Sequence, residues 1–294
     1  MLEKVLCFVY IKQAPGTILK MIKKKFSRFD QYKAYFYEIK IIILNNMEFE
    51  FDFVLSVFLT SLNILFYVFF WISVYGKSVS VDGVNLQQML VYSVVSNFLF
   101  EIFEINVSGQ INDNARSGNI SYLLTKPMDL MNFWLFMDLG QAVINFARCI
   151  PPIAVTVAFC FHFHIDTSPI IFLAFLLSAS FAYIIMWHLS FMIGLIAIWK
   201  NELGTIAQLK DILVMLLSGS FLPLWFFPAV FQRISCFLPF QYIYQIPLGI
   251  LIGKYQSREL CLYLVIQSAW AVGLMILARK CFQIACKRVT IQGG

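Results

Sequence analysis

Long apolar runs, separated by short polar segments, leave this chain few environments in which it can fold. The sequence is 60% hydrophobic and only 13% charged, whereas soluble domains average about 25% charged residues. A bilayer core of about 30 Å takes about 20 apolar residues per helix, and runs such as 51–75 and 168–198 reach that length. A spanning β-strand would alternate apolar and polar residues, which these runs do not. We therefore expect an all-α integral membrane protein.

The apolar runs predict a single domain of six transmembrane helices over residues 51–294. The expected spans are about 51–75, 86–107, 133–163, 168–198, 205–222 and 259–282. Ahead of them, residues 1–30 form a basic extension. Residues 31–50 mix aromatic and charged side chains, a pattern typical of an amphipathic helix that lies in the headgroup layer.

The placement of charge predicts the orientation of this domain. The net charge is +6. With six spans, most lysines and arginines fall on one side of the membrane, and the other side keeps only Lys77, Arg233, Lys254 and Arg258. Because cytoplasmic loops carry the excess of such residues, we expect a multi-pass protein of the cell (inner) membrane with both termini in the cytoplasm. The basic cluster 20–28 suits anionic lipid headgroups, and no nucleic-acid partner is expected.

A polar insert, residues 111–130, connects the second and third spans on the predicted cytoplasmic side. Gly118 is suited to end one helix and Asn119 to cap another. A short element then follows, and Pro127 stops it. Two interpretations stay open, a docking knob for another protein and an ordinary interfacial loop. The residues of this short element and its ends are Gly118, Asn119, Ile120, Tyr122, Leu123, Leu124, Lys126 and Pro127.

Four charged residues fall inside expected spans. Glu101 and Glu104 have the three-residue spacing that places two side chains on one helical face, which suits a polar gate or a cation contact. They could equally reach the inner headgroups. Asp138 and Arg148 are ten residues apart, too far along one helix to pair, so Arg148 is a candidate partner for Glu101 or Glu104. Buried charges in lipid should face protein or water.

Residues 223–258 are apolar but cannot form one straight spanning helix. Four prolines interrupt the segment, and proline breaks the helical hydrogen-bond ladder. Irregular backbone at membrane depth is tolerated only where protein or a water-filled cavity covers it. We expect short re-entrant helices in the outer leaflet, punctuated by Pro223, Pro228, Pro239 and Pro247.

No catalytic or metal-binding motif is evident, and we expect no enzyme activity in this chain. Gly76-Lys77-Ser78 resembles the end of a phosphate-binding loop, but Trp71 stands where that motif needs glycine. His162 and His164 are two residues apart, whereas helical metal ligands favour four. The seven cysteines have no regular spacing, and His188 within the fourth span suits a structural role better than a proton relay. If ATP drives the protein, another chain must bind it.

Several segments together resemble the permeases of ABC type-2 exporters, specifically the bacterial subfamily with six spans. The resemblance rests on the insert Ser117–Pro127, on Ser218–Pro228, on Leu238–Phe240, and on Pro247–Gly253 with the terminal Gln292-Gly-Gly294. It implies that the insert is the coupling helix of an export permease. It also implies separate ABC ATPase subunits that hold ATP and Mg²⁺, with no cofactor in this chain.

The same resemblance implies a second permease chain, with a related partner favoured over an identical copy, in contact with membrane lipids. The apolar, aromatic-rich sequence suits a hydrophobic or amphipathic substrate such as a drug, a lipid or a peptide. An ion-coupled secondary transporter or a channel is the alternative, since Glu101, Glu104, Asp138, Arg148 and His188 could line an ion path. Such a protein would work without an ATPase.

Overall fold

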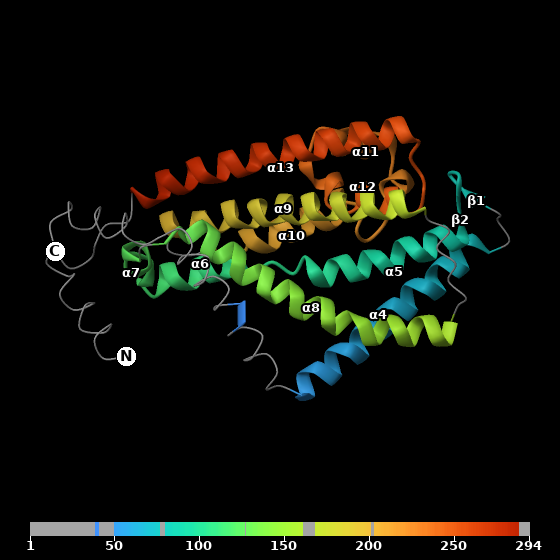
Figure 1. The fold of residues 1–294 in the computed structure, drawn as a ribbon, viewed down its shortest axis with the longest axis horizontal. Coiled ribbons are helices and arrows are strands. Elements are labelled where there is room, and N and C mark those ends of the chain that lie inside the picture. The colour runs from blue at the N-terminus through green and yellow to red at the C-terminus, as the bar shows by residue number, and fades with distance from the viewer. Residues whose placement is uncertain are drawn as a thin grey trace, which may run out of the picture.

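The fold is built around one long central helix, α9 (Pro169–Lys200). The computed structural model describes residues 39–40, 50–76, 80–126, 128–160, 168–200 and 203–287. Helices α13 (Ser257–Cys286), α6 (Val107–Arg116) and α12 (Gln245–Leu251) pack against α9. On the other side of the molecule, α4 (Glu50–Tyr75) packs against α5 (Leu86–Ile102) and α8 (Leu130–Cys160), as Figure 1 shows.

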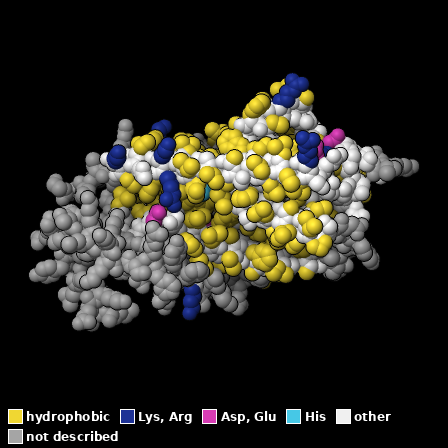
Figure 2. Space-filling view, turned by 45° about the horizontal axis from the view of Figure 1, so that its top comes forward, with side chains coloured by type: hydrophobic (Ala, Val, Ile, Leu, Met, Phe, Trp, Pro, Cys, Tyr) yellow, Lys and Arg dark blue, Asp and Glu magenta, His cyan; other side chains and the backbone are white. Residues whose placement is uncertain are grey.

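Helix α7 (Asn119–Thr125) lies at one end of this bundle, and the hairpin β1 (Ser80–Val81)–β2 (Val84–Asn85) lies at the other (Figure 1). The C-terminal ends of α9 and α13 and the start of α8 are at the α7 end. The apolar side chains of the long helices cover the middle of the face in Figure 2, and most of its lysines and arginines lie toward the ends. This distribution is the one expected for helices that cross a membrane.

Over the residues that the structure describes, the chain is an all-α membrane protein apart from the short hairpin. Among the described residues, four helical segments are long and apolar enough to cross a membrane: 54–75, 86–116 (α5 and α6 taken together), 169–200 and 257–286. A fifth span is possible if the pair Ala229–Cys236 and Pro239–Leu251, bent by 79°, counts as one. Helix α10 (Ile206–Leu217), in the predicted fifth span, has 12 residues and is therefore only about 18 Å long. The six-span arrangement stays a prediction.

The predicted second span is not one continuous helix. Helix α5 ends at Ile102, residues Phe103–Asn106 are not helical, and α6 resumes at Val107. The expectation that Glu101 and Glu104 share a helical face is therefore wrong, because Glu104 lies beyond the end of α5. The helix–break–helix unit extends to Arg116, nine residues past the predicted end of the span at 107.

The turn between α6 and α7 depends on a glycine. Helix α6 is followed by Ser117 and then by Gly118, whose φ of +72° lies in the left-handed region. Glycine enters this region without a steric penalty. Asn119 was expected to cap the second helix, but it is the first residue of α7, and Gly118 occupies the capping position without a side-chain bond.

The apolar segment after α10 folds into short elements separated by prolines. They are η2 (Leu224–Phe226), α11 (Ala229–Cys236), η3 (Pro239–Tyr242) and α12. Pro223 and Pro228 precede η2 and α11, Pro239 begins η3, and Pro247 lies in the first turn of α12, where its missing N–H costs least. The prolines therefore set the boundaries of the elements in this segment.

Buried polar side chains satisfy the backbone of this irregular segment. The Tyr92 hydroxyl donates to the Gly219 carbonyl at 2.7 Å, and the Gln245 Oε1 accepts from the Leu224 N–H at 3.1 Å. Gln267 Nε2 on α13 donates to the carbonyl of Tyr242 at 2.8 Å. Each of these contacts replaces a backbone bond that a regular helix would have made.

The β1–β2 hairpin packs against the proline-rich segment at the end of the molecule opposite α7. Lys254 Nζ lies 3.0 Å from Asp82 Oδ2 and 3.9 Å from the centroid of the Trp225 ring. Trp71 and Tyr75, at the end of α4, are buried beneath these elements, and the Tyr75 hydroxyl donates to the Val84 carbonyl. The hairpin and the proline-rich segment thus form one packed cap.

Some predictions fall outside the described residues. They concern residues 1–30, all of the predicted interfacial helix except Ile39, Lys40 and Glu50, the residues Pro127, His162 and His164, and the end of the chain from 288. Ile39 and Lys40 are helical, and Ile39 lies against Gly140 of α8, where a Cβ atom would be 3.4 Å from the Ile39 Cα.

Candidate functional site

Helix α7 divides its side chains between the bundle and the exterior. Ile120 and Leu123 are buried in the main hydrophobic core, with 6% and 9% of their surface exposed. Tyr122 is 54% exposed, and Gly118 and Asn119 are exposed beside it. The inner pair anchors the helix by apolar burial, which leaves the outer residues available to contact another protein.

Two further residues of the predicted coupling set lie at the edge of this surface. Leu124 and Lys126 are half-buried. Lys126 Nζ lies 5.6 Å from the centroid of the Tyr122 ring and 5.5 Å from that of Phe133, within the range of cation–π attraction. Lys126 therefore helps to position Tyr122 rather than standing alone as an exposed positive charge.

Helix α6, which precedes α7, packs closely against the central helix α9. A Cβ atom at Gly194 of α9 would lie 2.9 Å from Ile111 Cδ1 and 3.0 Å from Ser108 Cα of α6, so only glycine permits this approach. Asn112 Oδ1 on α6 also accepts a hydrogen bond from the Leu203 N–H at 2.9 Å. Helix α6 is therefore closely packed against α9, and it leads through Ser117 and Gly118 into α7.

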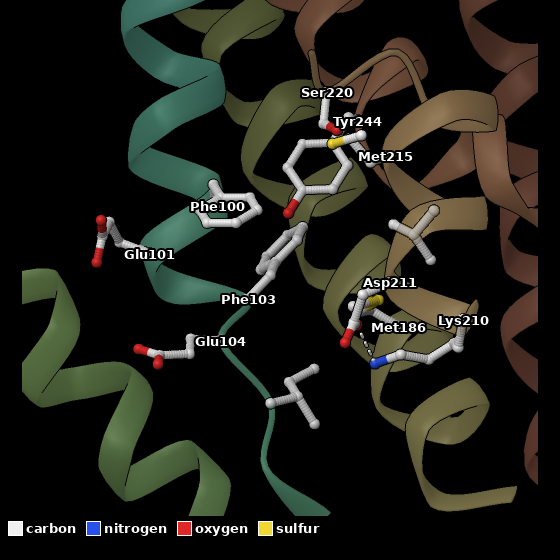
Figure 3. A pocket seen from close by; sticks show the side chains of 12 residues that line it. Phe100, Glu101, Phe103, Glu104, Met186, Lys210, Asp211, Met215, Ser220 and Tyr244 are labelled. Carbon is white, nitrogen blue, oxygen red and sulfur yellow. Dashed lines mark ion pairs between the residues drawn. The ribbon is translucent and has the colours of Figure 1, made fainter. Parts of the chain in front are cut away.

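A pocket of about 350 Å³ lies beside the break between α5 and α6 (Figure 3). Its walls come from the end of α5, the break itself, α9, α10 and the chain around Ser220 and Tyr244. Most lining side chains are apolar or aromatic, as expected for a pocket that receives organic molecules. The lining residues are Phe100, Glu101, Phe103, Glu104, Ile105, Met186, Lys210, Asp211, Val214, Met215, Ser220 and Tyr244.

The charged groups of the pocket lie on opposite sides. Lys210 is only 8% exposed, and its Nζ lies 2.7 Å from Asp211 Oδ1 and 2.9 Å from Ser190 Oγ. Figure 3 shows the carboxylates of Glu101 and Glu104 pointing away from this pair. The aromatic rings of Phe103 and Tyr244, with centroids 5.5 Å apart, also line the pocket.

The two glutamates are held from neighbouring helices. The Thr60 hydroxyl of α4 donates to Glu101 Oε1 at 3.3 Å. Asn145 Nδ2 of α8 donates to the Glu101 carbonyl at 2.9 Å and lies 3.3 Å from Glu104 Oε2. These contacts brace the break, so the glutamates have structural partners as well as a place in the pocket wall.

The other predicted intramembrane charges are not pocket residues. Asp138 on α8 is 2% exposed and contacts α6 and α9, while the half-buried Arg148 is an electrostatic neighbour of Glu101. His188 Nδ1 lies 2.7 Å from the Ile184 carbonyl within its own helix. Among the described residues, no cluster of histidine, cysteine and acidic side chains has the geometry of a metal site.

Sequence reasoning missed the residues that form the far wall of the pocket. Lys210 and Asp211 are adjacent charges within an otherwise apolar run, which is the same criterion that selected Glu101 and Asp138. Tyr244 and Phe103 carry no comparable sign in the sequence. Their place in the pocket depends on the break after α5 and on the fold of the proline-rich segment.

A helical membrane bundle with a pocket in its wall and an exposed short helix at one end is an arrangement compatible with a membrane transport protein. Residues 61–293 match the family model described as ABC-2 family transporter protein. The chain therefore belongs to the ABC-2 transporter family and is a multi-pass permease of the ABC transporter type. No curated protein and no solved structure matches it. Members of this family are the transport component of their systems and associate with ABC ATPases.

Proposed function

We propose that this chain is the permease subunit of an ATP-driven ABC exporter in the bacterial inner membrane. Separate ATPase subunits, which hold ATP and Mg²⁺, dock on α7. The observation that best supports docking on α7 is that Ile120 and Leu123 are buried and anchor the helix, whereas Tyr122 lies on an exposed face. The residues of the coupling surface are Gly118, Asn119, Tyr122 and the half-buried Leu124 and Lys126, with Pro127 directly after them.

The pocket is the proposed substrate site. Its aromatic and aliphatic walls suit a hydrophobic or amphipathic molecule such as a drug, a lipid or a peptide. A second permease chain completes the pathway, and a related partner is favoured over an identical copy. ATP binding has to favour the outward-open state strongly, because moving a population from 1:99 to 99:1 takes about 5.5 kcal/mol.

Copurification tests the proposal directly. The protein, solubilised from its native membrane, is expected to bring down an ATPase, and vesicles containing the complex should accumulate a fluorescent hydrophobic substrate only when ATP is supplied. Transport by this chain alone, without nucleotide, would refute the proposal.

Substitution of Tyr122 tests the coupling surface. Tyr122→Ala should lower transport per ATP hydrolysed without reducing the amount of folded protein, since Tyr122 is exposed. Phe237→Ala, which removes an aromatic ring that is 81% exposed on the proline-rich segment, is the matched control and should keep wild-type coupling. Leu123→Asp is a poor test, because a carboxylate at this buried position would disturb the packing of α7 itself. If Tyr122→Ala and the wild type transported the same amount of substrate per ATP hydrolysed, α7 would not be the site of ATPase coupling.

An ion-coupled carrier is the second candidate, favoured by the Lys210–Asp211 pair in the pocket wall. Paired charges of this kind occur in ion pathways through membranes. Collapse of the proton and sodium gradients distinguishes the two functions. It should abolish transport by a carrier and leave ATP-driven export in vesicles unchanged.

A further inference from the structure

The pocket beside the α5–α6 break has more negative than positive charge in the part of the chain that the structure describes. Its lining contains three acidic side chains, Glu101, Glu104 and Asp211, and one basic side chain, Lys210. The charge of Lys210 is already matched, because its Nζ lies 2.7 Å from Asp211 Oδ1 and 2.9 Å from Ser190 Oγ. The two glutamates are therefore the excess charge, which favours a ligand of the opposite sign in a medium of low dielectric constant.

Glu104 is the better placed of the two glutamates to meet a ligand. It lies in the non-helical break and is exposed, and the donor 3.3 Å from its Oε2 is the neutral side chain of Asn145. Glu101 is half-buried, accepts from the Thr60 hydroxyl and has Arg148 as an electrostatic neighbour. A neutral donor does not cancel the charge of a carboxylate, so Glu104 keeps its attraction for a cation.

A hydroxyl group with no hydrogen bond to the described residues points into the same pocket. Tyr244 is only 2% exposed. Figure 3 shows its hydroxyl directed toward the ring of Phe103 and into the space that the lining side chains surround. Buried polar groups are nearly always hydrogen-bonded. The hydroxyl of Tyr244 is therefore suited to an occupant that brings a polar group into the pocket.

The rest of the lining suits an apolar or aromatic body. Phe100, Phe103 and Tyr244 are aromatic, and the faces of such rings attract cations as well as apolar groups. Phe100 is 60% exposed and Met215 is 43% exposed, so the lining reaches the outer surface of the bundle at α5 and α10. A molecule dissolved in the bilayer can approach the pocket from that side without passing through water.

We propose that this pocket selects a cationic amphiphile, a molecule with an apolar or aromatic body and one protonated amine. The amine offsets the charge of Glu104, the body packs against Phe100, Phe103 and Met215, and the Tyr244 hydroxyl forms one hydrogen bond with the bound molecule. An anionic amphiphile would meet two carboxylates whose charge it cannot offset. This inference rests on the proposed function for the export of the bound molecule, but the charge preference is a property of the pocket.

Three phenylhexyl compounds that differ only in their end group test the charge preference. Phenylhexylamine is cationic at neutral pH, phenylhexanol is neutral and phenylhexanoate is anionic. The protein is purified together with the chains that accompany it and is placed in nanodiscs of zwitterionic lipid without nucleotide. Equilibrium dialysis gives the dissociation constants, and empty nanodiscs give the partition into lipid, which is subtracted.

The removal of one charge should affect only the cation. In the wild type, the amine should bind about tenfold more tightly than the alcohol, which corresponds to about 1.4 kcal/mol, and the anion should bind most weakly. Glu104→Gln keeps an oxygen that can accept from Asn145 but loses the charge, so it should weaken amine binding about tenfold and leave alcohol binding unchanged. Asp113→Asn, which removes a carboxylate from an exposed position on α6 outside the pocket, is the matched control and should keep all wild-type dissociation constants.

Substitution of the tyrosine locates the binding site. Tyr244→Phe removes only the hydroxyl and should weaken the amine and the alcohol alike by about fivefold, the effect of one hydrogen bond. Unchanged affinities in this variant would place the bound amine elsewhere and overturn the inference.

Four further outcomes would also overturn it. They are equal binding of the amine and the alcohol, tightest binding of the anion, the same loss in Asp113→Asn as in Glu104→Gln, and no binding of any of the three compounds. ATP-independent transport would refute the proposed function, while the dissociation constants would still decide the charge preference of the pocket.

Discussion

At the scale of single residues, buried polar side chains stabilise the irregular part of this membrane protein. Gln267 is fully buried on α13 and makes three hydrogen bonds. Its Nε2 donates to the carbonyls of Ser178 and Tyr242, and its Oε1 accepts from the Ser178 hydroxyl, all at 2.8 Å. Tyr92 and Ser96 on α5 do the same for the carbonyls of Gly219 and Ser220. These side chains let a non-helical segment persist beside apolar helices.

Gln267→Leu should lower the free energy of unfolding by about 1–2 kcal/mol, because hydrogen bonds between membrane helices contribute amounts of this order. The measurement is thermal unfolding of the purified protein in detergent. Gln208→Leu, at an exposed position on α10, makes the same chemical change outside the bundle and should leave the melting temperature nearly unchanged. Similar melting temperatures for the two variants would contradict a structural role for Gln267.

Reversal of charge should reveal a preference of Arg148 for one glutamate. Arg148→Glu is expected to reduce the yield of folded protein, since it places a third acid near Glu101. Addition of Glu101→Arg should recover part of the yield, whereas Glu104→Arg should not, because Glu104 already contacts Asn145. Fluorescence-detected size-exclusion chromatography of these three variants and the wild type measures the yield of folded protein. If the yield recovered with Glu104→Arg and not with Glu101→Arg, the partner of Arg148 would be Glu104 instead of Glu101.

At the scale of secondary-structure elements, two of the turns next to helices are made by glycines with positive φ. Gly118 turns the chain from α6 into α7, and no atom lies within 4 Å of the place where its Cβ would be. Gly219 has a φ of +82° and follows α10, and its Cβ would be 2.5 Å from Gln245 Oε1 and 3.0 Å from the Tyr92 hydroxyl. The turn at Gly118 requires glycine only for its positive φ. The turn at Gly219 also requires glycine because a Cβ atom would clash with Gln245 and Tyr92.

Substitutions at the two glycines should therefore have graded effects. Gly118→Ala should cost about 1–2 kcal/mol, the penalty of a left-handed residue with a Cβ atom. Gly118→Asn should cost less, because asparagine tolerates this conformation. Gly219→Ala should be the most destabilising, since it adds a steric clash to the strain. Melting temperatures in the order wild type, Gly118→Asn, Gly118→Ala, Gly219→Ala are expected, and a different order would contradict the assignment.

At the scale of the whole molecule, positive charge gathers at the α7 end. The cations at or near helix ends there are Arg116, Lys126, Lys200, Arg279, Lys280 and Lys287. At the hairpin end, the described residues include Arg233, Lys254 and Arg258, and Lys254 is paired with Asp82. Because the cytoplasmic side of a membrane protein carries the excess of lysine and arginine, the α7 end is expected to face the cytoplasm, where an ATPase can reach it.

Labelling of single cysteines should decide this orientation. Ser80→Cys in β1 and Ser117→Cys before α7 are both exposed positions. In intact cells, a membrane-impermeant maleimide should react with the cysteine at 80, and it should react with the one at 117 only after permeabilisation. The parent protein, with its own cysteines, provides the background. Reaction at 117 in intact cells would place α7 outside and exclude an ATPase contact there.

The sequence alone was sufficient to predict the helical membrane class and the proline-divided segment, because both depend on local composition. The runs 51–75 and 168–198 correspond closely to α4 and α9, and Pro223, Pro228 and Pro239 stand at element boundaries. The interruption after Ile102 was not predicted, since residues 103–106 contain neither proline nor glycine, the residues that most often mark a helix break. The shared face of Glu101 and Glu104 was inferred wrongly for the same reason.

The sequence by itself determined that this protein folds in a lipid bilayer, because apolar runs of sufficient length are stable only in lipid and tolerate few charges there. Only the tertiary structure decided which side of α7 is exposed, which residues line the pocket, and how Asp138 meets the side chains of Gln110 and Trp187. The physical reason is that hydropathy belongs to single residues. A hydrogen bond between α8 and α6, or a cavity between α5 and α10, exists only after distant segments have packed together.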